Sequence, residues 1–344
     1  MRNGEKVMKF WQTSYIHKNK SKLIIILLAI LLVVGLFLGI MCGSIFIEPK
    51  EIYNIFTSDE ITKTGRILYY VRFPRVIGAM VAGVGLSVAG VVIQTILNNP
   101  LAGPNIIGVN AGAGLAVALF SLIIPKALSF LPIFAFLGAF ITMLFIYFLG
   151  EKTGSSKLTL VLAGVAINSF FNACTDFIHT LSDEAVLSSY MFKIGGLTGI
   201  QIPILKVATI VILIATIILM FFSNELEILS LGEQTAKTLG LPVRFYRFLF
   251  LMLASILAGA SVSFAGLIGF IGIIVPHLAR LLVGDQIPYL IPTSALLGAL
   301  FMVLCDLISR VIAIPSEIPV GIVLSFIGAP FFIFLLLQKK RGIK

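Results

Sequence analysis

Apolar residues gather along the chain in ten runs that are separated by shorter polar stretches. Each run is close to the roughly 20 residues that an α-helix needs to cross the hydrocarbon core of a bilayer. Lipid cannot hydrogen-bond exposed backbone groups, so runs of this kind are expected to be helical. The pattern therefore predicts an all-α, polytopic membrane protein with about ten transmembrane helices. Their approximate ranges are 23–47, 76–97, 105–124, 131–150, 158–180, 207–223, 247–264, 266–283, 289–309 and 318–338.

One polar stretch, SLGEQTAKTLGLP from Ser230 to Pro242, resembles a piece of a soluble protein. Ser230 and Glu233 have the spacing of a capping box, in which each side chain satisfies a free backbone N–H at a helix start. Glu233 and Lys237 stand one turn apart in the favourable order. Gly240 suits the left-handed position after a helix, and Pro242 cannot continue it. The stretch predicts a helix of about nine residues, roughly 14 Å long, which is short enough to need support from a partner.

The composition agrees with a membrane location. The 344 residues are 59% hydrophobic and 12% charged, with a mean hydropathy of +1.10, whereas soluble domains have about 25% charged residues. The first run is too long for a signal peptide and lacks a small-x-small cleavage site, so we expect it to remain as a helix. The predicted organisation is a basic tail over 1–22, a single ten-helix domain over 23–338 and a short tail over 339–344.

The lysine and arginine residues predict the orientation, because short cytoplasmic loops carry an excess of them. With ten spans and the N-terminus inside, 16 of the 25 lysine and arginine residues fall on the inner side. Both termini are therefore expected in the cytoplasm, together with the stretch 230–242. The net charge of +10 follows mostly from this topology, and it gives no reason to expect a nucleic-acid partner.

The sequence has none of the motifs that would indicate an enzyme. It has no G-x-x-x-x-G-K-[ST] loop, no H-E-x-x-H and no Cys/His cluster with metal spacing. The three histidines lie far apart, so no catalytic residue, metal or cofactor is expected. The cysteines are expected inside helices as small apolar residues; they are Cys42, Cys174 and Cys305.

Arginines mark the outer ends of two predicted helices. The motif RFPR, from Arg72 to Arg75, opens the second run at the outer surface. These arginines either anchor the helix at the interface by snorkelling or form a docking patch for an acidic partner, since guanidinium groups hold carboxylates in bidentate pairs. In the ninth run, Asp306 and Arg310 stand one turn apart and could neutralise each other.

Two other segments are unusual for lipid-facing sequence. Between the second and third runs, prolines and glycines accompany Gln94, Asn99 and Asn110, which are interpreted either as parts of a tight turn or as pathway or gate groups. In GLIGFIGIIVPHLAR, glycines at every third position from Gly266 would allow close helix contact, and a proline would kink the helix. The adjacent His277 is interpreted as a hydrogen-bonded helix-end group.

These clusters, in their order along the chain, resemble the FecCD-type permeases of bacterial ABC importers. The matching elements are RFPR, NNPLAGPNIIGVNAGAG, LVLAGVAIN, LGEQTAKTLG, GLIGFIGIIVPHLAR, CDLISR and EIPVGIVLSFIGAPFF, and they cover residues 65 to 335. The resemblance implies a subunit in the bacterial cell membrane, surrounded by lipid, that pairs with a second copy or close paralogue around a translocation path. It also implies two further partners, a cytoplasmic ATPase dimer and an extracellular substrate-binding protein.

The resemblance also implies residue roles. The positions that would pack into a groove of the ATPase are Gly232, Glu233, Ala236, Leu239 and Gly240. Arg72, Arg75 and Arg310 would receive glutamates of the binding protein, and Asn99 and Leu101 would belong to a cytoplasmic gate. One departure is Phe192, where many relatives carry a tryptophan, so the preferred ligand could differ here.

The cargo implied is an iron–siderophore chelate or haem, with cobalamin as an alternative. A self-sufficient secondary transporter is a rival interpretation, but it would favour intramembrane carboxylates as ion relays, and only Asp176 and Asp306 are suitable. That interpretation also leaves the stretch 230–242 unexplained. A membrane-embedded enzyme is the third interpretation, and it has no visible nucleophile, metal or acid–base group.

Overall fold

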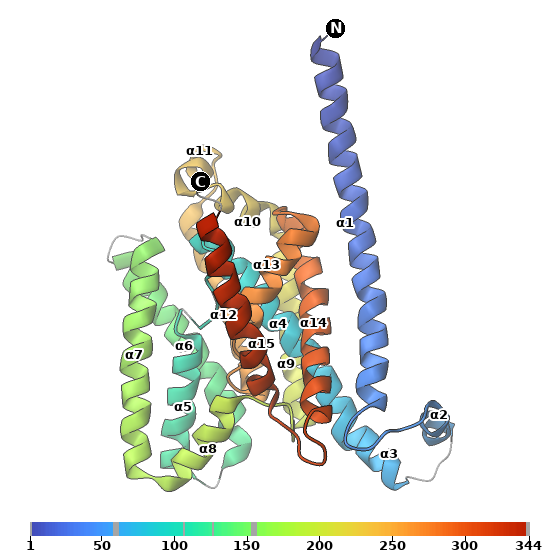
Figure 1. Cartoon of the computed structure of the whole chain (residues 1–344). Helices are drawn as coiled ribbons and strands as arrows, with labels where there is room; N and C mark the ends of the chain where they lie inside the picture. Colours follow the sequence, from blue (N-terminus) through green and yellow to red (C-terminus); the bar gives the residue numbers. More distant parts are fainter. Residues whose placement is uncertain (1, 58–61, 106, 126, 153–156, 342–344) are drawn as a thin grey trace.

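The computed structural model describes residues 2–57, 62–105, 107–125, 127–152 and 157–341, and within these ranges the chain is helical and contains no strand (Figure 1). The helices are α1 Arg2–Met41, α2 Pro49–Thr57, α3 Lys63–Ile67, α4 Phe73–Leu97, α5 Val109–Ile123, α6 Leu131–Lys152, α7 Lys157–Leu181, α8 Asp183–Ile194, α9 Ile202–Phe221, α10 Ser223–Ser230, α11 Glu233–Thr238, α12 Val243–Ala265, α13 Ile271–Val283, α14 Ile287–Val311 and α15 Val320–Arg341. A π-helical turn, Leu68–Arg72, leads into α4, and a 3-10 turn, Leu128–Phe130, precedes α6.

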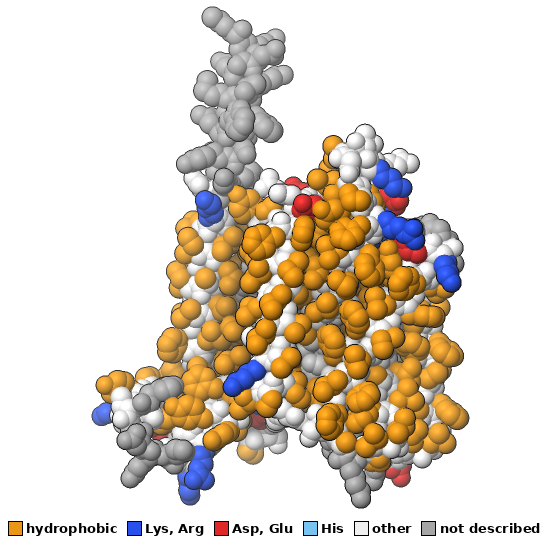
Figure 2. Space-filling model, turned by 180° about the vertical axis from the view of Figure 1, so that it is seen from behind, with side chains coloured by type: hydrophobic (Ala, Val, Ile, Leu, Met, Phe, Trp, Pro, Cys, Tyr) orange, Lys and Arg blue, Asp and Glu red, His pale blue; other side chains and the backbone are white. Residues whose placement is uncertain are grey.

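The predicted all-α membrane architecture is confirmed. Each of the ten predicted runs contains one helix, and seven helical segments of the described residues are long and apolar enough to cross a membrane. The helices in the third, eighth and tenth runs, which are α5, α13 and α15, are shorter apolar helices. The number of spans therefore stays a prediction. Hydrophobic side chains cover most of the face in Figure 2, and charged side chains gather mainly towards its two ends.

Helix α4 forms the centre of the bundle. Its most apolar window is 83% buried, against 22% for the corresponding window of α1. Two glycines let neighbouring helices approach it closely. A methyl group on Gly83 would lie 2.2 Å from the carbonyl oxygen of Gly298 in α14, and one on Gly90 would lie 2.0 Å from the carbonyl oxygen of Gly272 in α13. Only glycine therefore fits at these two crossings.

One boundary of the first predicted run and one of the eighth are wrong. Helix α1 ends at Met41, so Cys42 lies just outside it, whereas Cys174 and Cys305 lie within helices as expected. In the eighth run, residues 266–270 are not helical, because Gly266 and Phe270 both have positive φ angles, +71° and +66°. Of the glycines in this run, Gly272 makes the expected close helix contact, with α4.

The irregular segment 266–270 and the connection between α8 and α9 are held by hydrogen bonds to the ends of neighbouring helices. The amide of Leu267 donates to the carbonyl oxygen of Phe192 in α8 (2.9 Å), and the amide of Gly196 donates to that of Ala265 in α12 (2.9 Å). The amide of Gly321, at the start of α15, donates to the carbonyl oxygen of Gly195. Non-helical backbone within a membrane protein needs such internal partners.

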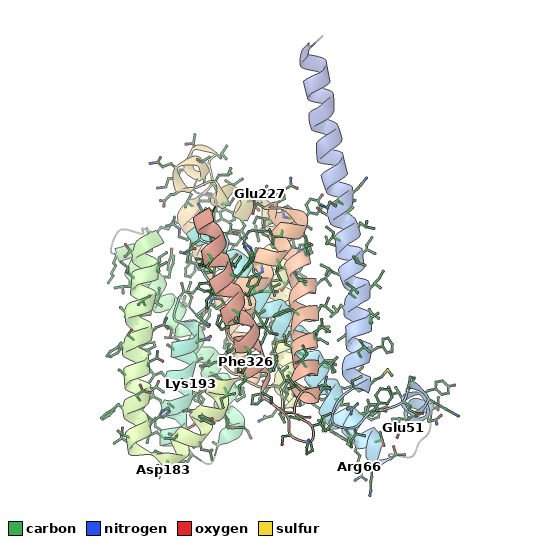
Figure 3. All side chains as sticks on the ribbon, in the orientation of Figure 1. Glu51, Arg66, Asp183, Lys193, Glu227 and Phe326 are labelled. Atoms are coloured by element: carbon green, nitrogen blue, oxygen red, sulfur yellow. The ribbon has the colours of Figure 1, made fainter. Side chains whose placement is uncertain are left out.

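The two ends of the described chain lie at the same end of the bundle as α10 and α11 (Figure 1). Glu51, Arg66 and Asp183 lie at the opposite end, while Lys193 stands between the ends at a height similar to that of Phe326 (Figure 3). This arrangement agrees with the expected grouping of both termini with the stretch 230–242. Which end faces the cytoplasm stays a prediction from the charge distribution.

The crossing of α4 and α13 gives a test of the packing. Gly90→Ala should lower the free energy of unfolding by about 1–3 kcal/mol, because the new methyl group meets backbone rather than a movable side chain. Gly196→Ala is the matched control, since a methyl group there has no atom within 4 Å. The unfolding midpoint of the detergent-solubilised protein measures both variants, and equal midpoints would contradict the close crossing.

Candidate functional site

The stretch 230–242 forms a shorter helix than predicted. Helix α11 has six residues, and the expected capping box is wrong: Ser230 is the last residue of α10, and its hydroxyl donates to the carbonyl oxygen of Glu227 (2.6 Å). Gly232 takes the N-cap position with a φ of +103°, which only glycine adopts readily. Two consecutive helices meet here, so Ser230 serves the end of the first.

The other local predictions for this stretch are confirmed. Gly240 has a left-handed φ of +81°, and the Glu233 carboxylate lies 2.8 Å from Lys237 Nζ. A second cation, which the sequence did not indicate, also binds this carboxylate: Arg247 Nη2 of α12 donates to it at 2.7 Å. The hydrogen bonds from Lys237 and Arg247 lower the pKa of Glu233 to about 2, so the carboxylate stays ionised at neutral pH and ties α11 to α12.

Ala236 does not have the surface position that was expected. It is fully buried within this chain's own hydrophobic core, whereas Leu231 and Leu239 are each 60% exposed. The support for this short helix therefore comes in part from its own chain. Leu239 and Gly240, which directly follow α11, are exposed and can be reached by a partner, whereas Ala236 cannot.

Arg75 is the centre of a buried cluster of charges. Its Nε donates to the carboxylate of Asp306 (2.8 Å), its Nη1 donates to Glu317, and its Nη2 lies 3.4 Å from the Ser309 hydroxyl. Arg310 Nε lies 3.1 Å from the second oxygen of Asp306. The expected pairing of Asp306 with Arg310 is thus confirmed, and Arg75 and Glu317 extend it.

Arg72 and Arg310 bind the C-terminal end of α1. Arg72 Nη1 donates to the carbonyl oxygens of Ile40 and Met41 (2.7 Å each), and Nη2 donates to that of Ile45. Arg310 Nη1 donates to the carbonyl oxygens of Gly39 (2.9 Å) and Cys42 (3.0 Å). The last carbonyl groups of a helix have no partner within the helix, and here guanidinium groups satisfy them.

These contacts contradict the expectation of exposed arginines at the outer surface. Arg72, Arg75 and Arg310 are 5%, 4% and 2% exposed, so none of them snorkels or forms an open patch. Their acceptors are far away in the sequence, up to 271 residues for Arg310 and Gly39, which is why the sequence pattern missed them. A docking role for these arginines stays a prediction.

Two of the predicted pathway residues make structural contacts. Gln94 is buried, its amide nitrogen lies 3.4 Å from the carbonyl oxygens of Gly272 and Ile273, and its amide oxygen accepts from Arg280. The Asn99 side-chain oxygen accepts a hydrogen bond from the amide of Leu101 (3.0 Å). This is an Asx turn, which tightens a loop. The interpretation as a tight turn is supported, and the gate role of Asn99 and Leu101 stays a prediction.

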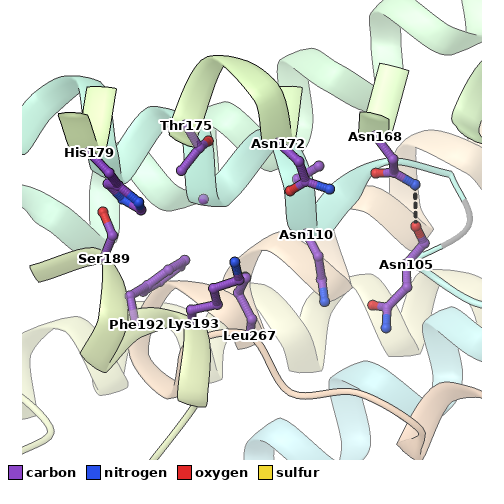
Figure 4. A pocket seen from close by; sticks show the side chains of 12 residues that line it. Asn105, Asn110, Asn168, Asn172, Thr175, His179, Ser189, Phe192, Lys193 and Leu267 are labelled. Carbon is purple, nitrogen blue, oxygen red and sulfur yellow. Dashed lines mark hydrogen bonds between the residues drawn. The ribbon is translucent and has the colours of Figure 1, made fainter. Parts of the chain in front are cut away.

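Asn110 lines a polar cavity of about 270 Å³ between α5, α7, α8 and the segment 266–270 (Figure 4). Phe192, the site of the family departure, lines it as well, and the Asn168 side chain donates to the Asn105 carbonyl oxygen at its edge (2.9 Å). Helix α8 was not predicted as a separate element, although Ser182 caps it by accepting the amide of Ala185 (3.2 Å). The lining residues are Asn105, Asn110, Ala111, Gly114, Asn168, Asn172, Thr175, His179, Ser189, Phe192, Lys193 and Leu267.

Metal chemistry has no visible site in the described ranges. No three residues among their histidines, cysteines and acids are grouped to hold an ion. His277 lies inside α13 rather than at its end, with its ring 6.2 Å from that of Phe331. The polar features of the described chain are therefore the exposed residues around α11, a buried charge cluster and a polar cavity.

Comparison with known proteins decides the family. The family model described as the FecCD transport family matches residues 27–338. The chain belongs to the FecCD transport family. It is therefore a transport permease subunit, and its apolar helices make it a multi-pass membrane protein. Permeases of this family act with ATPase and substrate-binding partners.

Three similar proteins cover nearly the whole permease. The iron(3+)-hydroxamate import system permease protein FhuG of Bacillus subtilis is 35% identical, over 93% of this chain and 98% of its own length. The probable heme-iron transport system permease protein IsdF of Staphylococcus aureus is 34% identical, over 94% and 98%. A solved metal-chelate type ABC transporter in an inward-facing conformation has a TM-score of 0.82 and 30% identity, over 92% and 99%.

The charge cluster of the permease gives a second test. Asp306→Asn leaves Arg75 and Arg310 without their shared carboxylate in a buried site, and we expect a loss of about 3–5 kcal/mol of stability. Glu317→Gln is the control, because Glu317 is 33% exposed, so its loss should cost less than about 1 kcal/mol. Thermal unfolding of the purified permease measures both, and a smaller effect of Asp306→Asn would contradict the central position of Asp306.

Proposed function

We propose that the permease forms the translocation pathway for an iron–siderophore chelate in a bacterial cell membrane, driven by ATP hydrolysis in a separate cytoplasmic ATPase dimer. The single observation that carries this is the similarity to an iron-hydroxamate permease over 93% of the chain. Haem is an alternative cargo because a heme-iron permease is similar to the same extent, and cobalamin is a further alternative from the family resemblance.

A second permease copy is part of the proposal. Helix α7 meets the requirements for a membrane span, but its most apolar window is only 22% buried within one chain. Asp176 is exposed on it, and Asn172 is exposed at the polar cavity that it lines. Polar and ionisable side chains are costly against lipid and usually face a partner helix or a water-filled path. A homodimer with the pathway between its copies would remove these side chains from lipid.

The proposed ATPase contact is the surface formed by α11 and the residues that flank it, namely Gly232, Glu233, Leu239 and Gly240 with Leu231 beside them. A large exposed leucine at Leu239 on a polar segment suits a groove in a partner better than it suits water. Glu233 has a second role in this proposal, because its bonds to Lys237 and Arg247 keep the contact surface attached to α12.

Leu239→Arg tests this contact. The variant should fold normally, because Leu239 is exposed, and should lose both ATPase association and ATP-dependent uptake of ferric chelate. Ala236→Arg is the contrasting variant, since it places the same side chain in the core and should lower the thermal stability of the permease itself. Native mass spectrometry of the gently solubilised complex should find two permeases with two ATPases, and only two permeases for Leu239→Arg.

The proposal fails if the unmodified complex imports chelate without ATP, or if a permease homodimer free of ATPase is the transporting species. Either result would restore the self-sufficient secondary carrier. If Leu239→Arg keeps its ATPases and full uptake, α11 is a surface connector and the ATPase binds elsewhere.

Docking of an extracellular binding protein to Arg72, Arg75 and Arg310 would require an exchange of partners. Arg75 already binds Asp306 and Glu317, and Glu317 is the accessible member of the cluster. An acidic group of a partner would therefore take the place of Glu317. This differs from simple surface docking, because the ion pair between Arg75 and Glu317 is lost when Arg75 pairs with the partner's acidic group.

Glu317→Gln tests the exchange. Removing the competing carboxylate should strengthen binding of the cognate binding protein about fivefold at low salt, which corresponds to about 1 kcal/mol. Asp306→Asn is not suitable, because it disturbs the buried part of the cluster. Titration of the binding protein onto the reconstituted permease measures the affinity, and unchanged or weaker binding would show that the arginines serve the fold alone.

A further inference from the structure

The cavity of about 270 Å³ contains polar atoms that its own chain leaves unsatisfied. Asn110 Oδ1, His179 Nε2 and Ser189 Oγ are buried without a hydrogen-bond partner among the described residues. They come from three helices, α5, α7 and α8, and their side chains line the same cavity (Figure 4). Ser189 is only 4% exposed, so open solvent does not explain its free hydroxyl.

Unsatisfied polar atoms that converge from three helices indicate an occupant. A buried polar group without a partner destabilises a fold, and native structures contain few of them. An apolar side chain at any of these positions would have avoided the cost. The cavity is therefore suited to a molecule that offers hydrogen bonds on several sides, such as water or an oxygen-rich ligand.

Charge narrows the kind of ligand. Among the lining residues that the structure describes, Lys193 is the only one with a lysine, arginine, aspartate or glutamate side chain. Carboxamides, the hydroxyls of Thr175 and Ser189 and the imidazole of His179 supply the remaining polar contacts. Asn110 Oδ1 can only accept a hydrogen bond, whereas the Ser189 hydroxyl can donate one, and donors beside the Lys193 ammonium group favour anionic oxygen atoms, and carboxylates in particular.

Size limits how much of the ligand the cavity encloses. About 270 Å³ is slightly below the roughly 300–1,000 Å³ of pockets that bury a drug-sized molecule. The cavity can therefore contact one face of a chelate while the remainder lies outside it. Lys193, which is exposed, stands at its edge and not at one of the charged ends of the molecule (Figure 3).

We propose that this cavity is a contact site for an anionic, carboxylate-bearing iron chelate, with Lys193 as the cationic group and Asn110, His179 and Ser189 as the hydrogen-bonding groups. This inference rests on the proposed transport function and specifies its substrate class. It also gives Phe192 a position from which its ring can limit the shape of the ligand.

Direct binding to the permease–ATPase complex in nanodiscs tests the site without the binding protein. The probes are ⁵⁵Fe-labelled ferric citrate, iron-free citrate and a neutral ferric trihydroxamate. Ferric citrate should bind more tightly than the neutral trihydroxamate. Lys193→Gln and Ser189→Ala should each weaken ferric citrate binding about fivefold, the effect of about one hydrogen bond or exposed charge contact.

Lys206→Gln is the matched control, because Lys206 is an exposed lysine of α9 that does not line the cavity. Thermal unfolding checks that the variants fold. Ser189→Ala should fold well because Ser189 Oγ has no hydrogen bond to lose within the described chain. Equal effects of Lys193→Gln and Lys206→Gln would overturn the proposal, as would preferred binding of the neutral trihydroxamate or tighter binding of iron-free citrate.

If Lys193→Gln weakens binding but Ser189→Ala does not, the effect is general surface attraction, and the cavity holds only water. The transport function is measured separately, as ATP-dependent chelate uptake with the cognate binding protein. Uptake that persists while citrate binding is absent overturns this inference alone. Absence of uptake of every chelate overturns the proposed function and this inference with it.

Discussion

Two buried guanidinium groups hold one end of α1 to the rest of the permease, and a third is joined to them through Asp306. The apolar part of α1 packs against α14 but is mostly exposed within this chain. Arg72 and Arg310 satisfy the carbonyl groups at its C-terminal end, and Asp306 joins Arg310 to Arg75. Since unpaired carbonyls and unpaired charges are both costly away from water, each part of the cluster requires the others. The positions of α1, α4 and α14 at this end depend on that mutual requirement.

Non-helical backbone inside the bundle also needs hydrogen-bond partners from the protein. The breaks before α9 and α13 are held by hydrogen bonds to neighbouring helix ends: Leu267 donates to Phe192 of α8, Gly196 donates to Ala265 of α12, and Gly195 accepts from Gly321 of α15. Glycine is needed where they touch: a methyl group on Gly321 would lie 1.9 Å from the Ile194 carbonyl oxygen. The polar cavity lies beside this junction. A transporter needs polar surface within the membrane, and at these breaks hydrogen bonds to neighbouring helices satisfy several of the freed backbone groups.

Helix α12 runs between the two sites proposed above, the ATPase contact around α11 and the polar cavity. It begins next to α11, to which Arg247 and the buried Ala236 attach it, and it ends at Ala265, next to the segment that lines the cavity. Its 23 residues span about 35 Å. A helix of that length has the surface proposed for the ATPase next to its first residue and the site proposed for the chelate next to its last, which is a simple physical basis for coupling them.

The sequence by itself determined the features that depend on near neighbours and on the surrounding lipid. Apolar runs of membrane length predicted the helices, because lipid leaves the backbone few alternatives. The local pairing of Glu233 with Lys237 and the left-handed Gly240 were equally predictable, as was the family from its ordered motifs. The tertiary structure alone decided which way side chains point. It turned Ala236 into the core, buried Arg72 and Arg75 against distant acceptors, unwound residues 266–270 and brought Asn110, His179 and Ser189 around one cavity. These features arise from contacts between helices far apart in the chain, and hydrophobic periodicity carries no information about which helices become neighbours.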